Sequence, residues 1–323
     1  MTTDWAAKWF EVRAERGQSD IATMMYQDQG KPIQRVHFPH READGFGKIQ
    51  LLLKADNIEI HAPIRPLKKP SSIFHFYLLL KGMIIHPRLP HNPWKHFSSD
   101  PTSGLPDEVS YWFLTPEENR KLKTLAKSRN LNIGFFILSE FDQIIKKHLY
   151  KNSNDKAVWL SPVDLRGAFP NARPNQNFVS FVVTEIVGVD NLRSVQESFE
   201  KYKKDLKSGV YWAFWELAHI GRWVGMRGMR WLSKQGTNKS FWMGSFSDLG
   251  VWNQEAIRNS AARNRHWVIA PPGSPAYPVG ITTIEWCDNR SITLKLHPAI
   301  CDKHSKEVSE EILAEFKRTI LKN

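Results

Sequence analysis

Residues 40–45 read His40-Arg41-Glu42-Ala43-Asp44-Gly45, which is the pattern H-x-x-x-D-G. The alternation over 31–38 predicts a strand before this segment, and the apolar spacing over 46–53 predicts a short buried helix after it. A histidine presented by such a turn can take a proton from a hydroxyl or an amine near neutral pH. A buried carboxylate close by can fix the local backbone through its own ion pair. The segment is therefore the leading candidate for a catalytic site.

Helices and strands mix along the rest of the chain. The sequence Thr115-Pro116-Glu117-Glu118 is a capping box with proline at the first helical position, so a helix is expected from there to about residue 129. Further helices are expected at 5–16, 133–149, 192–206, 211–233 and 306–321. Strands are expected at 157–160, 178–187, 240–246, 266–270, 280–287 and 291–296. This mixture predicts an α/β fold.

The composition bounds the class of protein. The chain has 323 residues, of which 41% are hydrophobic, and only two are cysteines, so neither disorder nor a disulfide scaffold is expected. No apolar run approaches the roughly 20 residues of a membrane span, and the charged first twenty residues do not resemble a secretory signal. We therefore expect a cytoplasmic protein. The polar segment 151–156 marks an expected boundary between two lobes, 1–150 and 157–323.

The net charge of +12, from 45 Lys and Arg against 33 Asp and Glu, favours a polyanionic partner. Candidates are a phosphate-rich cofactor, an acidic carrier protein, an anionic membrane surface and nucleic acid. The charge alone does not choose among them.

Two later segments add to the first motif. One reads Ser161-Pro162-Val163-Asp164-Leu165-Arg166-Gly167 and is followed by Asn175-Gln176-Asn177-Phe178-Val179-Ser180-Phe181; the other reads Gly244-Ser245-Phe246-Ser247-Asp248-Leu249-Gly250-Val251-Trp252. In this order the three segments resemble the chloramphenicol acetyltransferase-like superfamily, which includes condensation domains, plant-type (BAHD) acyltransferases and wax-ester synthases. The resemblance implies a two-lobed fold of mixed sheets flanked by helices, with an active-site tunnel between the lobes.

The resemblance also implies residue roles. His40 would be the general base, and Asp44 would be a structural residue paired with Arg166. Gly45, Asn177, Ser245 and Ser247 would lie at the substrate, and Gly250 would allow the late turn to form. The reaction would be attack of a hydroxyl or amine on a thioester, with coenzyme A or phosphopantetheine as the thiol carrier and with no tightly bound cofactor or metal. Expected partners are an acyl-CoA or an acidic acyl carrier protein, together with a small-molecule or lipid acceptor.

The sequence departs from the superfamily pattern at three places. Pro39 stands where many relatives have a first histidine, and Asp248 stands where the late turn usually has asparagine. The motif begins at residue 40, whereas relatives usually have over a hundred residues before it, so we expect a shortened N-terminal lobe that a homo-oligomer could complete. These departures leave a catalytically inactive lipid- or carrier-binding relative as an alternative function.

A basic aromatic segment over 211–234 is the second unusual feature. It contains five Trp and Tyr residues with several arginines, namely Tyr211, Trp212, Trp215, Trp223, Trp231, Arg222, Arg227 and Arg230, and its glycines argue against one stiff helix. Three interpretations stay open: a membrane-interface element, an acyl-chain groove in which Trp215 contacts substrate, and ordinary core packing. A basic membrane-associated binding protein is accordingly a further alternative, with peripheral membrane contact.

Other partners are not indicated. No nucleic-acid-binding motif accompanies the aromatic segment, so nucleic acid is not expected. The histidines at 86, 91 and 96 recur every five residues in a proline-rich segment. That spacing does not suit a metal site, and no metal is predicted.

Overall fold

The computed structural model describes residues 4–28, 31–60, 66–86, 91–98, 108–169, 172–187, 192–236 and 242–322. Within these ranges the strands form two sheets. The three-stranded sheet has the order β2 (Gln34–Pro39), β1 (Ile21–Gln27), β7 (His266–Ala270). The six-stranded sheet has the order β3 (Ser110–Leu114), β9 (Asn289–Leu296), β8 (Val279–Trp286), β6 (Gly244–Trp252), β4 (Ala157–Asp164), β5 (Val179–Ile186). The α/β class predicted from the sequence is confirmed.

The six-stranded sheet is mixed. β6 runs parallel to both of its neighbours, β4 and β8, whereas the other pairs of adjacent strands in this sheet are antiparallel. Each sheet also holds strands from both ranges of the expected two-lobe division, because β7 pairs with β1 and β3 pairs with β9. The division at 151–156 stays a prediction.

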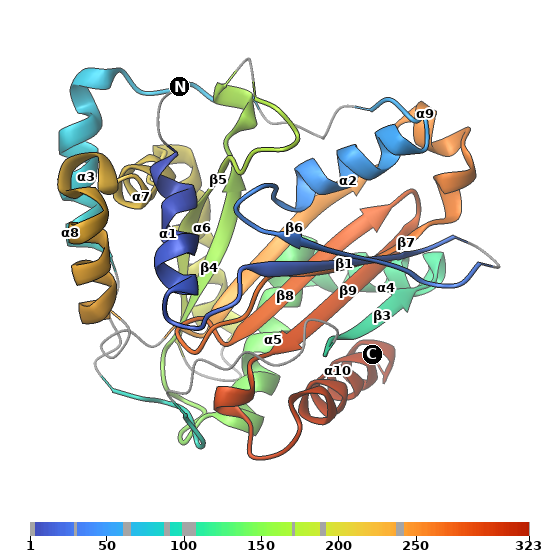
Figure 1. Ribbon diagram of the computed structural model, residues 1–323. Helices are drawn as coiled ribbons and strands as arrows, with labels where there is room; N and C mark the ends of the chain where they lie inside the picture. Colours follow the sequence, from blue (N-terminus) through green and yellow to red (C-terminus); the bar gives the residue numbers. More distant parts are fainter. Residues whose placement is uncertain are drawn as a thin grey trace.

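Layers cover the two faces of the six-stranded sheet. On one face, α4 (Pro116–Ser128), α5 (Ile133–Leu149) and α10 (Ser305–Lys322) share a buried core with β3, β8 and β9. On the other, α2 (Gly45–Ala55) and the three-stranded sheet pack on β6 and β8 through residues such as Ile49, Trp252 and Trp286. Figure 1 shows this second layer in front of the large sheet. The candidate motif therefore lies where the two sheets face each other.

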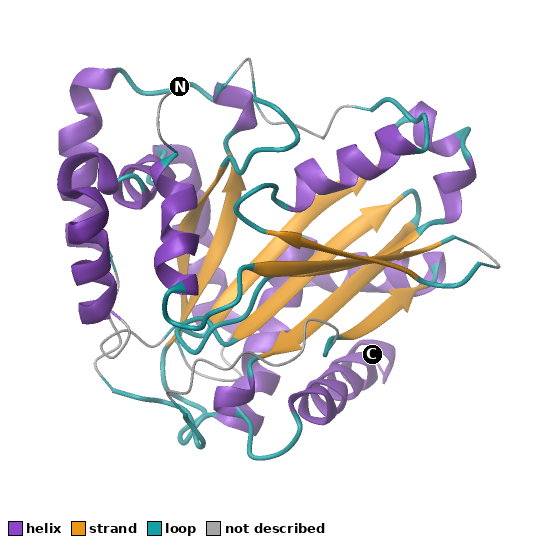
Figure 2. Ribbon diagram, viewed as in Figure 1, coloured by secondary structure: helices purple, strands orange, loops and turns teal. Residues whose placement is uncertain are grey.

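The remaining helices gather at one edge of the molecule. They are α1 (Trp5–Ala14), α3 (His75–Ile85), α6 (Leu192–Ser208), α7 (Tyr211–Ala218) and α8 (Gly221–Gly236), with a short α9 (Glu255–Arg258) elsewhere. α7 packs on β5, and α3 packs on α7 (Figure 2). In the part of the chain that the structure describes, no helix combines the length and the apolar character needed to cross a membrane.

Several elements agree with the sequence predictions, and others correct them. The capping box at Thr115 is formed, and the helices at α4, α5 and α10 have nearly the expected bounds. The helical segment expected over 211–233 consists of two helices, α7 and α8, and α8 is kinked at Gly225, whose φ is +61°, as the glycines of the segment had indicated. The strand expected at 240–246 begins at Gly244 and continues through the expected late turn to Trp252; residues 240 and 241 lie outside the described residues.

Four of the helices and strands were missed by the sequence patterns, and one of them is the four-residue α9. β1 has the sequence IATMMYQ and is buried on both sides between β2 and β7, so its residues do not alternate. β3 is a short strand that pairs with β9. α3 was not predicted, and its large apolar side chains lie mostly on its solvent-exposed side.

Candidate active site

The turn after β2 places His40 and Asp44 at the start of α2. Asp44 is the N-cap of α2, and its Oδ1 accepts the N–H of Gly47 at 3.0 Å. An acidic N-cap accepts a hydrogen bond from a free backbone N–H, and its negative charge interacts favourably with the positive end of the helix dipole. The motif spacing therefore has a local cause, because the aspartate that begins the helix fixes the turn that presents the histidine.

The ring of His40 is oriented by the backbone of its own turn. Its Nδ1 lies 3.2 Å from the carbonyl oxygen of Ala43. A carbonyl can only accept, so in the neutral ring Nδ1 carries the proton and Nε2 is the basic nitrogen. The ring also packs edge-on against Phe10 of α1, with centroids 5.6 Å apart. Burial lowers the pKa of His40 below 6.5, and this effect outweighs the nearby charge of Asp44.

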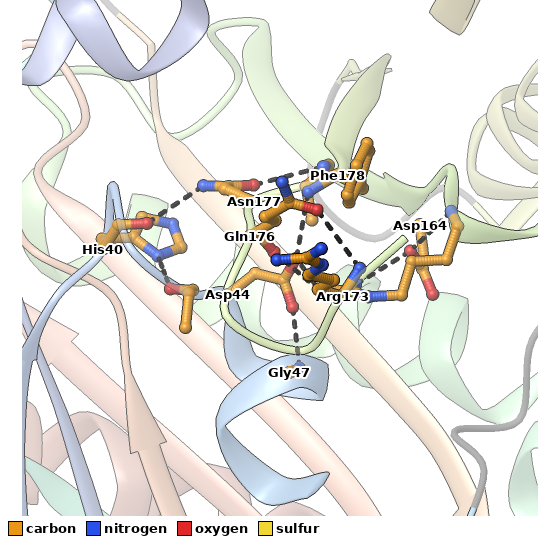
Figure 3. A network of polar contacts seen from close by, with 11 residues as sticks. His40, Asp44, Gly47, Asp164, Arg173, Gln176, Asn177 and Phe178 are labelled. Carbon is orange, nitrogen blue, oxygen red and sulfur yellow. Dashed lines mark hydrogen bonds and ion pairs between the residues drawn. The ribbon is translucent and has the colours of Figure 1, made fainter. Parts of the chain in front are cut away.

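Asn177 holds the backbone of the same turn. Its Nδ2 donates to the carbonyl oxygen of His40 at 3.1 Å, and its Oδ1 accepts the N–H of Val179 at 3.2 Å. The residue thus links the histidine turn to the start of β5 (Figure 3).

The predicted pair between Asp44 and Arg166 is present and buried. Nη2 of Arg166 lies 2.7 Å from Oδ2 of Asp44, and the two side chains are 2% and 3% exposed. Arg166 also contacts Asp164 Oδ1 at 3.0 Å and donates to the carbonyl oxygen of Gln176 at 2.9 Å. The second oxygen of Asp44 also accepts the N–H of Phe178 at 3.3 Å. Both oxygens of Asp44 are therefore engaged in holding the scaffold (Figure 3).

The charges in this cluster support one another. Burial acts to lower the pKa of Arg166, but Asp44 and Asp164 outweigh it and raise that pKa. Burial raises the pKa of Asp164, against the opposing charge of Arg166. Two carboxylates around one guanidinium thus keep the arginine charged in a site that excludes most water.

A cavity of about 90 Å³ lies beside this turn. Its polar lining consists of His40, Asp44, Asp164, Ser247, Asp248 and Thr282. The remaining lining is mostly apolar and comes from β1, β2, β4, β5, β6, β7 and α2, and it includes Ala22, Phe38, Pro162, Val179, Leu249 and Ile269. The cavity therefore lies between the two sheets, next to the H-x-x-x-D-G turn.

Two hydroxyl groups face this space from neighbouring strands. Ser247 of β6 and Thr282 of β8 are direct partners in the parallel register, and both line the cavity. Thr282 is 3% exposed. They are the two hydroxyl side chains among the residues that line the cavity.

The predicted site residues fall into three groups. His40, Asp44, Gly45 and Ser247 line the cavity. Arg166 and Asn177 lie behind it and hold the motif. Ser245, Gly250 and Trp215 are not among the lining residues.

Gly250 and Trp215 have structural surroundings of their own. Gly250 has a φ of +71° at the irregularity in β6 between Asp248 and Val251, and its N–H donates to Asp248 Oδ1 at 3.0 Å. It therefore allows β6 to bulge, as a left-handed residue can. Trp215 lies in a core with Phe169 and Phe178, with ring centroids 5.7 and 6.4 Å away.

The basic aromatic segment divides between core and surface. Tyr211, Trp212, Phe214 and Trp215 of α7 are buried, as the core-packing interpretation expected. Trp223 and Trp231 of α8 are 53% and 61% exposed.

Sequence patterns did not single out Thr282 as a site residue. β8 is buried on both faces along its whole length, so period-2 alternation gives no sign of which residues face a cavity. Asp164 and Gln176 were quoted within the motif. The contact of Asp164 with Arg166 is local, between residues two positions apart, whereas the contact of Gln176 needs the segment before β5 to fold back onto Arg166.

No group of three or more His, Cys, Asp and Glu among the described residues has the arrangement of a metal site. The thioester carriers expected from the sequence, coenzyme A and phosphopantetheine, stay predictions.

Comparison with known proteins matched no protein-family model and no curated protein. Solved structures do match. The chain is similar to trichothecene 15-O-acetyltransferase from Fusarium sporotrichioides, with a TM-score of 0.60 and 13% identity over 99% of this chain and 75% of that chain. It is similar to the cyclization-docking bidomain of the peptide synthetase EpoB from Sorangium cellulosum, with a TM-score of 0.52 and 11% identity over 89% of this chain and 59% of that chain.

A third similar structure is the epimerization domain from the third module of tyrocidine synthetase B, with a TM-score of 0.50 and 12% identity over 99% of this chain and 76% of that chain. The chain thus spans three quarters of the acetyltransferase but less than two thirds of the EpoB bidomain. At these identities the comparisons show the fold, and the predicted chloramphenicol acetyltransferase-like fold is confirmed. A tunnel passing between two lobes stays a prediction.

Proposed function

We propose that this chain, which has the chloramphenicol acetyltransferase-like fold, is an acyltransferase that moves an acyl group from a thioester to a hydroxyl or amine. The observation that carries the proposal is the state of His40. Its Nδ1 is bound to Ala43, so Nε2 is the basic nitrogen, and the residue lines a cavity between the two sheets. The lowered pKa keeps the ring neutral at physiological pH, as a general base requires.

The proposed reaction is direct transfer. Nε2 of His40 takes the proton of the acceptor O–H or N–H as the acceptor atom bonds to the thioester carbonyl carbon. The carbonyl oxygen carries the negative charge of the tetrahedral intermediate. When the C–S bond breaks, the thiolate takes the proton from His40, and the products are the ester or amide and the free thiol.

The developing oxyanion needs preorganised donors. Ser247 and Thr282 supply two hydroxyls on adjacent strands at the cavity. We assign the oxyanion to this side, with Ser247 as the first candidate donor because it faces the cavity from the segment that resembles the superfamily.

Asp44 and Arg166 are positioning residues in this proposal. Their ion pair joins the histidine turn to the segment after β4, and Asn177 fixes the His40 carbonyl from the start of β5. A base within hydrogen-bond reach of its proton depends on such fixed geometry.

The size of the cavity bears on the acyl group. A volume of about 90 Å³ is smaller than the roughly 150 Å³ that holds benzene in an apolar protein cavity. We therefore expect acetyl and other short acyl thioesters to react faster than long-chain ones.

The donor is an acyl-CoA or an acyl group on a carrier protein. The net charge of +12 suits both, because coenzyme A phosphates and acidic carrier helices are anionic. The likeness to an acetyltransferase supports the first, and the likeness to peptide-synthetase domains supports the second. The acceptor is a small molecule or a lipid with a hydroxyl or amine.

The test is thiol release from matched donors. Acetyl-, butyryl- and palmitoyl-CoA, and the same acyl groups on a phosphopantetheinylated carrier protein, are incubated with a panel of alcohols and amines. The wild type is compared with His40→Ala and with His91→Ala, whose histidine is exposed in a loop. Release that only His40→Ala loses supports the proposal. Release that His40→Ala retains contradicts it, and carrier binding without release from any donor indicates an inactive carrier-binding protein.

A further inference from the structure

α3 presents a row of large apolar side chains to solvent. From the preceding turn to its end, the exposed residues recur at three- and four-residue spacing, and Ile73 and Ile84 are 81% and 82% exposed. The others are Phe74, Phe76, Tyr77, Leu80 and Met83. An apolar stripe on the outer side of a helix is the reverse of ordinary amphipathic packing.

The orientation of α3 is fixed by its inner side. Leu79 is buried there, and Gly82 lies so close to α7 that a Cβ on it would come 2.6 Å from the carbonyl oxygen of Ala213. The glycine thus allows the two helices to approach closely. Because this side is packed against α7, α3 cannot turn its apolar stripe inward by rotating.

A buried ion cluster joins the same helices. Glu216 of α7 is 1% exposed, and it contacts Nδ1 of His75 at 2.5 Å and Nη1 of Arg222 at 3.3 Å. Since His75 begins α3 and Arg222 lies in the first turn of α8, this carboxylate holds α3 and α8 to α7. The outer sides of α3 and α8 therefore form one fixed surface.

α8 extends the apolar surface of α3. Its exposed apolar residues are Trp223, Val224 and Trp231, and the ring of Trp223 packs against Phe76 with centroids 5.8 Å apart. Figure 1 shows α3 and α8 together at one edge of the molecule. We refer to the exposed residues of 73–84 and 223–234 as the α3–α8 face.

The charge of this face is of one sign. Residues 73–84 and 223–234 contain no Asp or Glu, but they contain Lys81, Arg227, Arg230 and Lys234. Arg227 and Lys234 are exposed beside Trp223 and Trp231 on the outer side of α8. Arg230 pairs with Glu15 at the end of α1 and Arg222 pairs with the buried Glu216, but the α3–α8 face itself contributes only cations. An apolar face whose own charges are all positive is complementary to a surface that is apolar inside and anionic outside.

We propose that the α3–α8 face binds the surface of a membrane that contains anionic lipids. Trp and Tyr favour the headgroup region, and Phe, Ile, Leu and Met can enter the acyl boundary while Lys and Arg contact the headgroups. The proposed membrane contact is independent of the acyl transfer proposed above.

The experiment is co-sedimentation of the full chain with vesicles of phosphatidylcholine, with or without phosphatidylserine. The wild type should bind the vesicles with phosphatidylserine, and binding should weaken as salt is raised. The variant Ile73→Ser/Ile84→Ser removes two highly exposed side chains and should lose about 10-fold or more in binding per residue. The variant Arg227→Gln/Lys234→Gln should lose roughly 5-fold per residue on the anionic vesicles.

Matched controls use exposed residues elsewhere. Val187→Ser/Leu192→Ser alters two apolar residues that are 51% and 46% exposed, and Arg193→Gln alters an exposed cation of α6. These variants should bind as the wild type does, and circular dichroism should show all variants folded.

Three results would overturn the proposal. The first is that the wild type fails to bind anionic vesicles at low salt. The second is that the α3–α8 variants bind the vesicles as the controls do. Alternatively, the wild type self-associates in solution and Ile73→Ser/Ile84→Ser abolishes that association without changing vesicle binding, which identifies a second copy of the chain as the occupant.

Discussion

Arg166 reaches across 122 positions of sequence to place its Nη2 2.7 Å from Oδ2 of Asp44. The contact joins the start of α2 to the segment that follows β4, and neither side chain is more than 3% exposed. The histidine turn is thus fixed to the six-stranded sheet by one buried ion pair. Because Asp44 also caps α2, the same carboxylate sets the local turn and the long-range contact.

Loss of this ion pair should lower the stability of the folded protein, because Arg166 holds the scaffold and is not expected to contact the substrate. Replacing Arg166 with Met leaves Asp44 and Asp164 buried without their cation, which should lower the free energy of unfolding by about 3–5 kcal/mol. Urea unfolding followed by fluorescence measures this change. Arg193→Met on α6 is the control, since that arginine is 86% exposed in its own pair. An Arg166→Met protein that is as stable as the wild type but inactive would show that the arginine acts on substrate instead.

The pH dependence of the reaction should follow the lowered pKa of His40. Burial places that pKa below 6.5, so the neutral base is already formed at pH 7. The acid limb of kcat/KM should therefore have its midpoint below pH 6.5, as measured by thiol release across pH in buffers of constant ionic strength. A midpoint at or above 6.5 would contradict the assignment of His40 as the base.

Protein stability should change with pH in the same direction. In the window between the folded pKa and 6.5, the unfolded chain binds more protons at His40 than the folded protein does. The contribution of this residue to stability is therefore complete above pH 6.5 and decreases as the pH falls toward the folded pKa. Urea midpoints of the wild type and His40→Ala at several pH values isolate the effect, which should be smaller in the variant.

Substitution of the two serines of β6 should have different effects on kcat. Ser247 lines the cavity opposite Thr282, whereas Ser245 does not line it. If the Ser247 hydroxyl stabilises the oxyanion, Ser247→Ala should lower kcat by roughly 10²-fold. Ser245→Ala is the matched control, and its kcat should stay within about 2-fold of the wild-type value, because the Ser245 hydroxyl does not line the cavity and so cannot donate to the oxyanion. Equal effects of the two substitutions would contradict this placement.

Substitution by alanine should affect stability differently at two glycines of α2. A Cβ on Gly47 would come 2.0 Å from the carbonyl oxygen of Pro174 and 3.0 Å from Nη2 of Arg166. Gly47→Ala should therefore destabilise the protein by about 1–3 kcal/mol. A Cβ on Gly45 would meet Leu249 at 3.5 Å, an ordinary contact, and would face the cavity.

Gly45→Ala should accordingly keep the wild-type unfolding midpoint while slowing transfer of the longer acyl groups more than that of acetyl. Thermal or urea unfolding gives the first comparison, and the donor panel gives the second. A Gly45→Ala protein that is destabilised as much as Gly47→Ala would show that this end of the helix has no free space.

The local signals in the sequence were enough to locate the motif and much of the scaffold. The H-x-x-x-D-G turn, the Asp44–Arg166 pair and the capping box at Thr115 depend on residues a few positions apart or on a matched motif order. The neighbours of each strand could not be read in this way. β7 joins β1 in one sheet while β3 joins β9 in the other, and such pairings depend on packing across hundreds of residues.

Elements whose surroundings differ from the usual pattern account for most of what was missed. β1 and β8 are buried on both faces, so alternation disappears, and Thr282 could not be told from a core residue. α3 has its apolar stripe outside, which periodicity alone cannot distinguish from a core-facing stripe. Trp215, expected at the substrate, lies instead in a core with Phe169 and Phe178, because an aromatic helix face also suits ordinary packing.

The most direct test of the acyltransferase proposal replaces the base alone. Thiol release from acetyl-CoA or an acetylated carrier protein is followed with the wild type and with His40→Asn, after unfolding curves have shown both to be folded. General-base catalysis contributes about 10²–10⁴-fold, so the variant should be slower by at least about 100-fold at saturating donor. Release by His40→Asn at the wild-type rate would contradict the account.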